Sequence, residues 1–159
     1  MADMLVRLYD LPELQPALAN LGDVQVRPAY PYELSPLRHF IEAHFSQGWA
    51  DEIVPGFSRQ PISVFIAHAA DRCVGFAAYE CTTRNYFGPE GVLKAYRGRG
   101  VGRALLLSCL HAMARMGYAY AIIGGAGPVD FYARCCGAVA IENSSPGFYR
   151  YPTIKPAPN

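Results

Sequence analysis

Residues 92–103 of this 159-residue chain have the sequence V-L-K-A-Y-R-G-R-G-V-G-R, and they decide its fold. The stretch begins with apolar residues typical of the end of a strand. It then passes through glycine at alternate positions, Gly98, Gly100 and Gly102, and continues as an apolar segment to Met116. Glycine adopts positive φ without strain and lets a ligand approach the backbone closely. The stretch therefore predicts a strand, a tight turn and a helix, in that order.

The turn has the chemistry of an anion site. The first N–H groups of a helix have no partner within the helix, and the helix dipole adds roughly half a positive charge there. Arg97, Arg99 and Arg103 add full positive charges around the same place. The turn therefore predicts a site for a phosphate or pyrophosphate group.

Two familiar nucleotide-binding loops do not fit these residues. A Walker-type loop ends in Gly-Lys-Ser/Thr, whereas here Gly102 is followed by Arg103 and Ala104. The dinucleotide fingerprint G-x-G-x-x-G would need glycine at position 103, which is arginine. The sequence excludes both loops.

The segments after the turn predict a parallel crossover. The helix over 103–116 is apolar almost all round, which is typical of a helix buried against a sheet. Residues 118–123 form an unbroken apolar run, which predicts a central strand parallel to the strand before the turn. A second helix follows Pro128, and residues 138–141 and 148–151 predict a closing hairpin around a Ser-Ser-Pro-Gly turn.

The segments before the turn predict strands and helices in a mixed order. Gly88-Pro89-Glu90-Gly91 interrupts the last of these strands, which predicts a bulge or splayed end that frees backbone groups from ladder bonding. The predicted elements are a strand at 24–29, a helix at 32–45, a second helix or loop at 49–57, a hairpin of strands at 62–68 and 73–79, and a strand at 86–92.

The length predicts one domain, which we place at residues 24–151. Residues 1–23 predict a strand-helix extension packed on that domain. The sequence does not decide whether this extension caps a sheet edge, lengthens the sheet or mediates self-association as a homodimer. Residues 152–159 predict a loose C-terminal tail.

Composition excludes several classes of protein. Fourteen basic and thirteen acidic side chains give a formal net charge of +1, so neither nucleic acid nor an anionic membrane is an expected partner. The five cysteines form no C-x-x-C pair and no zinc spacing, which indicates reduced thiols and no metal site. We see no signal-peptide start and no run near the roughly 18–20 apolar residues of a membrane span. The expected location is cytoplasmic.

Two segments resemble the GNAT acyltransferase superfamily. Arg97-x-x-Gly100-x-Gly102 is similar to the family signature Gln/Arg-x-x-Gly-x-Gly/Ala. Downstream, F-Y-A-R-C-C-G-A at 131–138 resembles the family's Phe-Tyr-x-x-x-Gly-Phe segment, displaced by one residue and ending in Ala138 instead of Phe. The resemblance covers about residues 24–151 and is strongest over 92–137.

The resemblance implies both a fold and a function. The fold is α/β (α+β), with one GNAT-like domain whose mixed central sheet has about six to seven strands, splayed between the fourth and fifth core strands, and helices on both faces. The function is that of an N-acetyltransferase, which transfers an acetyl group from acetyl-CoA to an amine of a small molecule or peptide by direct attack in a ternary complex. A non-catalytic acyl-CoA-binding sensor or regulatory module is the alternative.

The resemblance also implies a coenzyme A site at the turn. The splayed strand at 91–93 would offer a backbone N–H to the thioester carbonyl. Many family members carry asparagine where this chain has Gly125, so contacts of that loop with pantetheine must come from the backbone or be absent. The implied cofactor-binding residues are Val92, Leu93, Lys94, Arg97, Gly98, Arg99, Gly100, Val101, Gly102, Arg103, Gly125 and Tyr132.

The implied catalytic residues are an acid and a base. Tyr132 would lie near the sulfur of coenzyme A, where a phenol with a pKa of about 10 can protonate a thiolate whose pKa is near 8.5. Glu80 and Glu90 are equal candidates for the base, and a water-relayed base is a further option. His44 and Asp51, on the overlying helices, are the next candidates for the base after the two glutamates.

Acceptor contacts are expected from the early helical pair, which in the family lies over the acceptor site. The candidates are Trp49, Asp51, Glu52 and Phe57. Packing of the aromatic side chains in the core and solvation of the acidic ones explain these residues equally well.

Overall fold

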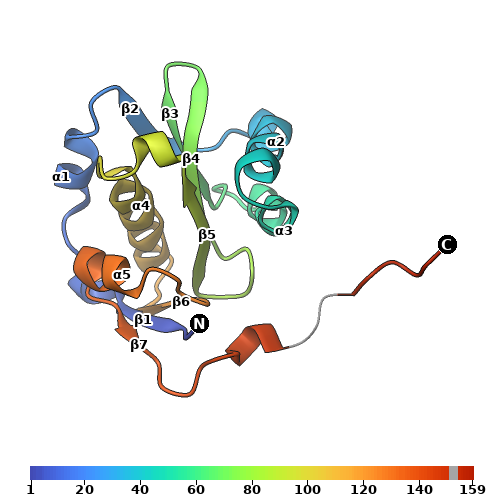
Figure 1. Cartoon of the computed structure of the whole chain (residues 1–159). Coiled ribbons are helices and arrows are strands. Elements are labelled where there is room, and N and C mark those ends of the chain that lie inside the picture. Colours follow the sequence, from blue (N-terminus) through green and yellow to red (C-terminus); the bar gives the residue numbers. More distant parts are fainter. Residues whose placement is uncertain (151–153) are drawn as a thin grey trace.

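The computed structural model describes residues 1–150 and 154–159, and it contains one seven-stranded sheet in the order β2-β3-β4-β5-β6-β1-β7 (Figure 1). The strands are β1 (Met4–Arg7), β2 (Val24–Pro28), β3 (Val64–Ala69), β4 (Arg72–Tyr79), β5 (Tyr86–Val92), β6 (Tyr120–Ile123) and β7 (Val139–Ala140). The helices are α1 (Leu14–Ala19), α2 (Leu34–His44), α3 (Gln47–Glu52), α4 (Val101–Arg115) and α5 (Val129–Cys136).

The sheet is mixed and splays between β5 and β6. These two strands are parallel and pair only at Tyr86 with Ile122 and Phe87 with Ile123, whereas β5 stays paired with β4 as far as Val92. All other neighbouring strands are antiparallel. The remainder of β5 therefore has no strand on its β6 side, which confirms the predicted splay and the predicted parallel crossover.

Helices cover both faces of the sheet, as predicted (Figure 1). On one face α4 is buried along most of its length, because its leucines pack against β3, β4 and β5. On the other face α2 and α3 pack as a pair. Strand β4 serves both layers, since Val74 and Ala77 belong to the α4 core while Phe76 and Ala78 belong to the α2–α3 core.

Strand β1 lies inside the sheet, between β6 and β7. It pairs antiparallel with both neighbours, and Met4 and Val6 are 1% and 0% exposed. Of the three roles that the sequence left open for residues 1–23, the structure therefore shows extension of the sheet.

The predicted closing hairpin is wrong. Val139 and Ala140 pair with β1, and residues 147–150 form a 3₁₀ turn (Gly147–Arg150) instead of a strand. The edge of β1 supplies a partner that local turn signals do not reveal, and the N–H of Ile141 donates to the carbonyl of Asp3 at 2.8 Å. Tyr151 of the predicted hairpin lies outside the described residues. Residues 154–159 have no regular secondary structure, and residues 152 and 153 of the predicted tail also lie outside the description.

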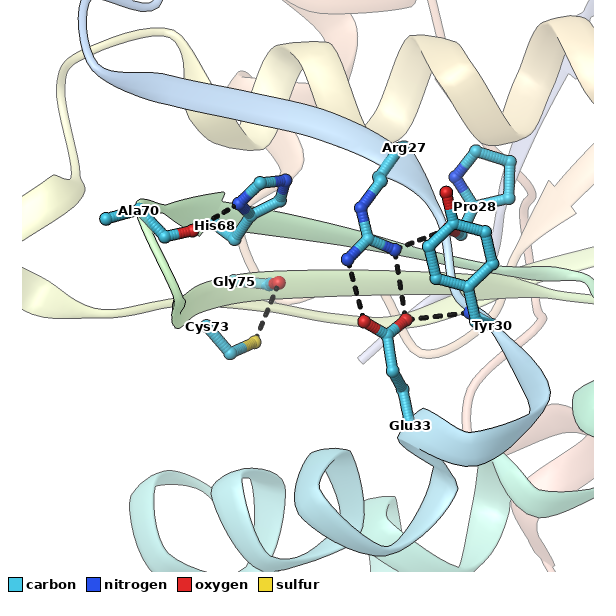
Figure 2. Close-up of polar contacts among 8 residues, drawn as sticks. All are labelled: Arg27, Pro28, Tyr30, Glu33, His68, Ala70, Cys73 and Gly75. Carbon is cyan, nitrogen blue, oxygen red and sulfur yellow. Dashed lines mark hydrogen bonds and ion pairs between the residues drawn. The ribbon is translucent and has the colours of Figure 1, made fainter.

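An ion pair fixes the connection from β2 into α2 (Figure 2). The Arg27 guanidinium donates to both carboxylate oxygens of Glu33, at 2.7 and 3.0 Å, and the Tyr30 N–H donates to the same carboxylate at 2.7 Å. These bonds hold the pKa of Glu33 below its usual range. The Arg27–Glu33 pair therefore holds the start of α2 against the end of β2.

Figure 2 also shows His68 on β3, whose Nδ1 lies 2.8 Å from the Ala70 carbonyl oxygen.

Candidate functional site

A cleft of about 870 Å³ opens where β5 and β6 separate. Its walls come from the α2–α3 region, β5, the 97–103 turn, the loop after β6 and the start of α5. The lining residues are Met1, Phe45, Trp49, Glu52, Phe87, Gly88, Pro89, Glu90, Gly91, Val92, Arg97, Gly98, Gly100, Gly102, Arg103, Ile123, Gly124, Gly125, Ala126, Gly127, Pro128, Phe131, Tyr132 and Tyr149.

One end of the cleft is basic and rich in free backbone donors. Gly100 caps α4 with a φ of 84°, a conformation that favours glycine, and no side chain caps the helix. The N–H groups of residues 101–103 therefore remain without a partner in their own helix. Arg97 and Arg103 line the same end, and Arg97 Nε donates to the Val92 carbonyl at 3.0 Å. This end can hold a phosphate or pyrophosphate group.

Four members of the predicted cofactor set lie outside the cleft lining, and the other eight line it. Arg99 Nη2 pairs with Asp23 at 2.7 Å, and its guanidinium lies 4.8 Å from the centre of the Tyr96 ring. Leu93, Lys94 and Val101 also do not line the cleft, because Leu93 is bonded to β4, Lys94 is exposed and Val101 is buried in the core. Of the three predicted arginines, the structure therefore brings only Arg97 and Arg103 to the cleft.

The backbone N–H of Val92 points into the space between β5 and β6. The Leu93 N–H donates to the Val74 carbonyl on β4 at 2.9 Å. Along an antiparallel strand, the backbone groups of successive residues point to opposite sides. The N–H of Val92 therefore points away from β4, into the space that β6 leaves open. It is a free donor for a ligand oxygen.

Tyr132 lies in the cleft wall on α5 and is only 8% exposed. Its ring packs edge-on against Phe87 and Phe131, with centroid distances of 6.2 and 5.2 Å. Burial raises the pKa of Tyr132, and the nearby Glu90 carboxylate raises it further. The phenol is therefore protonated at neutral pH and is available as a hydrogen-bond donor.

Glu90 also lines the cleft, from the part of β5 that pairs with β4 but has no strand on its β6 side. Its Oε1 is buried and has no hydrogen-bond partner in the described part of the chain, although the residue as a whole is partly exposed. Desolvation raises the pKa of Glu90 well above its usual value. This carboxyl group therefore keeps its proton to a higher pH than an ordinary glutamate does.

Glu80 does not line the cleft. It is 4% exposed and binds the backbone N–H of Asn85, the Tyr118 hydroxyl at 3.1 Å and the Arg59 guanidinium at 3.7 Å. Its carboxylate therefore anchors the loop between β4 and β5. The structure separates the two glutamates that the sequence ranked equally.

Of the remaining predicted side chains, two line the cleft and three do not. Trp49 and Glu52 line the cleft, whereas Phe57 packs on the α2–α3 core. Asp51 pairs with Arg38 at 2.6 Å on the outer surface. His44 is exposed and does not line the cleft.

Phe45, Phe87 and Tyr149 line the cleft although sequence reasoning did not select them. The lack of a side chain at Gly91 makes room for Phe45, since a Cβ there would lie 2.6 Å from Phe45 Cε1. That glycine was visible in the sequence, but its long-range neighbour was not. Tyr149 fell in the segment that was predicted to be a strand.

The glycine loop after β6 is tied to the N-terminal strand region. The Gly125 N–H donates to Asp3 Oδ1 at 2.8 Å, and the Tyr86 hydroxyl donates to Asp3 Oδ2 at 3.3 Å. The Gly125 N–H is therefore already used and leaves only its carbonyl for a ligand contact. Sequence reasoning also missed Asp3, because no motif links positions so far apart.

The comparison with family models agrees with this geometry. Residues 60–149, more than half of the chain, match the model of the acetyltransferase (GNAT) domain. The chain belongs to the GNAT acetyltransferase family. The signature at 97–102 and the segment at 131–138 therefore belong to a GNAT domain, as the sequence predicted. No curated protein matches this sequence closely.

Solved structures share the GNAT fold with this chain. The GCN5-related glucosamine N-acetyltransferase region of a fungal multi-domain β-N-acetylglucosaminidase superposes with a TM-score of 0.70 at 16% identity, over 88% of this chain and 19% of that one. A GCN5-related N-acetyltransferase from Sphaerobacter thermophilus gives 0.65 at 20% identity, over 88% and 48%. This GNAT chain thus spans from about a fifth to about half of their lengths.

A third GNAT structure was solved with a ligand. The GNAT family acetyltransferase from Brucella melitensis, in complex with acetyl-CoA, gives a TM-score of 0.54 at 21% identity, over 70% of this chain and 80% of that one.

In the described residues of our GNAT protein, no cluster of His, Cys, Asp and Glu is arranged to hold a metal ion. No helix in that part of the chain has the length and apolarity needed to cross a bilayer.

Proposed function

We propose that this GNAT protein is an acetyl-CoA-dependent N-acetyltransferase that acetylates an amine of a small molecule or peptide by direct attack in a ternary complex. One observation carries the proposal: a single cleft combines a basic helix start with a buried phenol and a buried carboxyl group. The likeness in fold to the Brucella melitensis protein, solved with acetyl-CoA, supports the choice of donor.

Acetyl-CoA would be held at two points, its pyrophosphate and its thioester. Its pyrophosphate would accept hydrogen bonds from the first N–H groups of α4 and from Arg97 and Arg103. Its thioester carbonyl would accept a hydrogen bond from the Val92 N–H, which polarises the carbonyl as negative charge develops on the oxygen. Binding energy from the distant pyrophosphate would fix the thioester for attack.

The transfer requires one bond to form and one to break. The neutral amine nitrogen attacks the carbonyl carbon, the C–N bond forms, and the C–S bond breaks to release the coenzyme A thiolate. The nitrogen proton passes to the Glu90 carboxylate, directly or through a water molecule, because Glu90 is the one predicted base candidate that lines the cleft. Its raised pKa makes the carboxylate a stronger base than that of an ordinary glutamate.

Tyr132 would stabilise the leaving thiolate. A simple thiol has a pKa near 8.5, so a phenol with a raised pKa keeps its proton and donates a hydrogen bond to the thiolate. Substituting Tyr132→Phe keeps the ring that packs on Phe87 but removes this donor. We expect kcat to fall about 100-fold, with little change in the KM for acetyl-CoA.

The test is amine-dependent release of free thiol from acetyl-CoA, measured over a panel of amines with the wild type and the Tyr132→Phe variant. Acetyl transfer that falls in the variant would support the proposal. Unchanged turnover in the variant would remove Tyr132 from the mechanism. Binding of acetyl-CoA without transfer to any amine would favour the sensor, for which the occupied Gly125 N–H is the supporting observation.

A further inference from the structure

The charged side chains of the cleft are divided between its two ends. Arg97 and Arg103 belong to the turn that follows β5. Glu52 lies in the same cleft but contacts Thr82, whose hydroxyl donates to Glu52 Oε1, and Thr82 precedes β5. Because β5 runs seven residues at about 3.3 Å each, the anionic part of the donor and Glu52 lie at opposite ends of the strand.

Glu52 keeps acceptor capacity for a ligand. A carboxylate has two oxygens and about four lone-pair sites, and Thr82 occupies one of them. None of the ion pairs among the described side chains involves Glu52. Tyr149 lies close to Glu52. Burial raises the pKa of Tyr149 to about 12, and the nearby Glu52 carboxylate contributes to this rise. The position favours a cation, because a half-buried carboxylate without an ion-pair partner is stabilised by a positive one.

Two aromatic rings connect the reacting region of β5 to the helix that carries Glu52. Phe45 lies directly against Gly91, and Trp49 stacks on Phe45 with a centroid distance of 5.8 Å. Glu52 follows Trp49 by three residues on α3, about one helical turn further along. A group bound by Glu52 is therefore not the amine that attacks a thioester beside Val92. The rings between them suit an apolar spacer.

We propose that the acceptor is a diamine, whose far cation is held by Glu52 while its spacer lies on Phe45 and Trp49 and its near, neutral amine attacks the thioester. This inference rests on the proposed function and names the acceptor class for the same cleft. Glu52 acts as a specificity-determining residue and takes no part in the bond changes. Monoamines of the same length fill the same path but leave Glu52 without its cation.

The experiment compares α,ω-diamines, from 1,3-diaminopropane to 1,8-diaminooctane, with the monoamines of equal carbon number. We expect kcat/KM to peak at one diamine length and to exceed that of the matched monoamine about 10- to 100-fold, mainly through KM. In Glu52→Gln this ratio should fall to about one. Because the ratio compares two substrates on one protein sample, a partly unfolded variant does not change it.

Asp51→Asn is the matched control, because Asp51 is the neighbouring carboxylate and pairs with Arg38 on the outer surface. It should keep the wild-type ratio. Equal rates for diamines and monoamines, or equal ratios in Glu52→Gln and Asp51→Asn, would overturn the inference while the acetyltransferase function stands. If no amine is acetylated, calorimetric binding of 1,6-diaminohexane to the coenzyme A complex decides: binding that Glu52→Gln abolishes supports the subsite, and no binding overturns it.

Discussion

Glu90 illustrates how burial changes the chemistry of a single carboxyl group. Its Oε1 has no partner in the described structure, and desolvation raises its pKa. On α4 and α5 the groups that face it, Cys109 and Tyr132, are neutral, and Glu90 in turn raises their pKa values. Desolvation is the cause of the rise in the pKa of Glu90, so burial favours its protonated form. In the proposed reaction this group would therefore act at a cost to folding.

The Glu90→Gln variant should reveal that cost as a pH dependence. Well below pH 4.3, about the pKa of an ordinary glutamate, Glu90 is protonated in the unfolded chain as well as in the folded protein. At higher pH the unfolded wild type releases the proton while the folded protein keeps it, so the wild type loses stability relative to the variant. The difference should grow by at most about 1.4 kcal/mol per pH unit until folded Glu90 ionises.

Urea unfolding of both proteins between pH 5 and pH 8 measures this difference. A stability difference that stays constant over that range would contradict the raised pKa.

The sequence could not have separated Glu90 from Glu80, since both are carboxylates near strand ends. Only the fold shows that one faces an unpaired gap while the other is bonded to Asn85, Tyr118 and Arg59.

Among the elements, β1 was the least predictable from sequence. It has four residues, and its partners β6 and β7 lie more than one hundred positions further along the chain. Its own pattern indicates a strand but not a place in the sheet. The hairpin predicted at the C-terminal end failed for the same reason, because β7 pairs with β1. In contrast, β5, the turn and α4 were predictable because their signals are local.

Substitution of Met4 tests whether β1 belongs to the core. Met4 is 1% exposed and pairs with Ile123 and Ala140, so Met4→Ala leaves a cavity between the sheet and its helices. We expect a loss of about 2–5 kcal/mol in the free energy of unfolding. Ile154→Ala is the control, because Ile154 is 94% exposed and should change stability by less than about 0.5 kcal/mol. Equal effects of the two substitutions would show β1 to be loosely attached.

At the scale of the whole molecule, the splayed sheet creates a cleft with two chemically different ends. The basic end was predictable, because the glycines and arginines that build it are contiguous in sequence. The acidic and aromatic end was predictable only in part: Trp49 and Glu52 were candidates, whereas Phe45 and Tyr149 arrive from segments with no motif. The proposed donor site is therefore a local feature of the sequence, and the proposed acceptor site is a product of the tertiary fold.

The most direct measurement is calorimetric binding of coenzyme A to the wild type and to three variants of the turn, Arg97→Gln, Arg103→Gln and Arg99→Gln. Arg97 and Arg103 line the cleft, while Arg99 is paired with Asp23 outside it. Each lost charge-assisted bond to phosphate should weaken binding about 10- to 100-fold, so Arg97→Gln and Arg103→Gln should bind weakly and Arg99→Gln should bind like the wild type. Equal affinities in all three variants, or no binding to the wild type, would contradict a donor site at the start of α4.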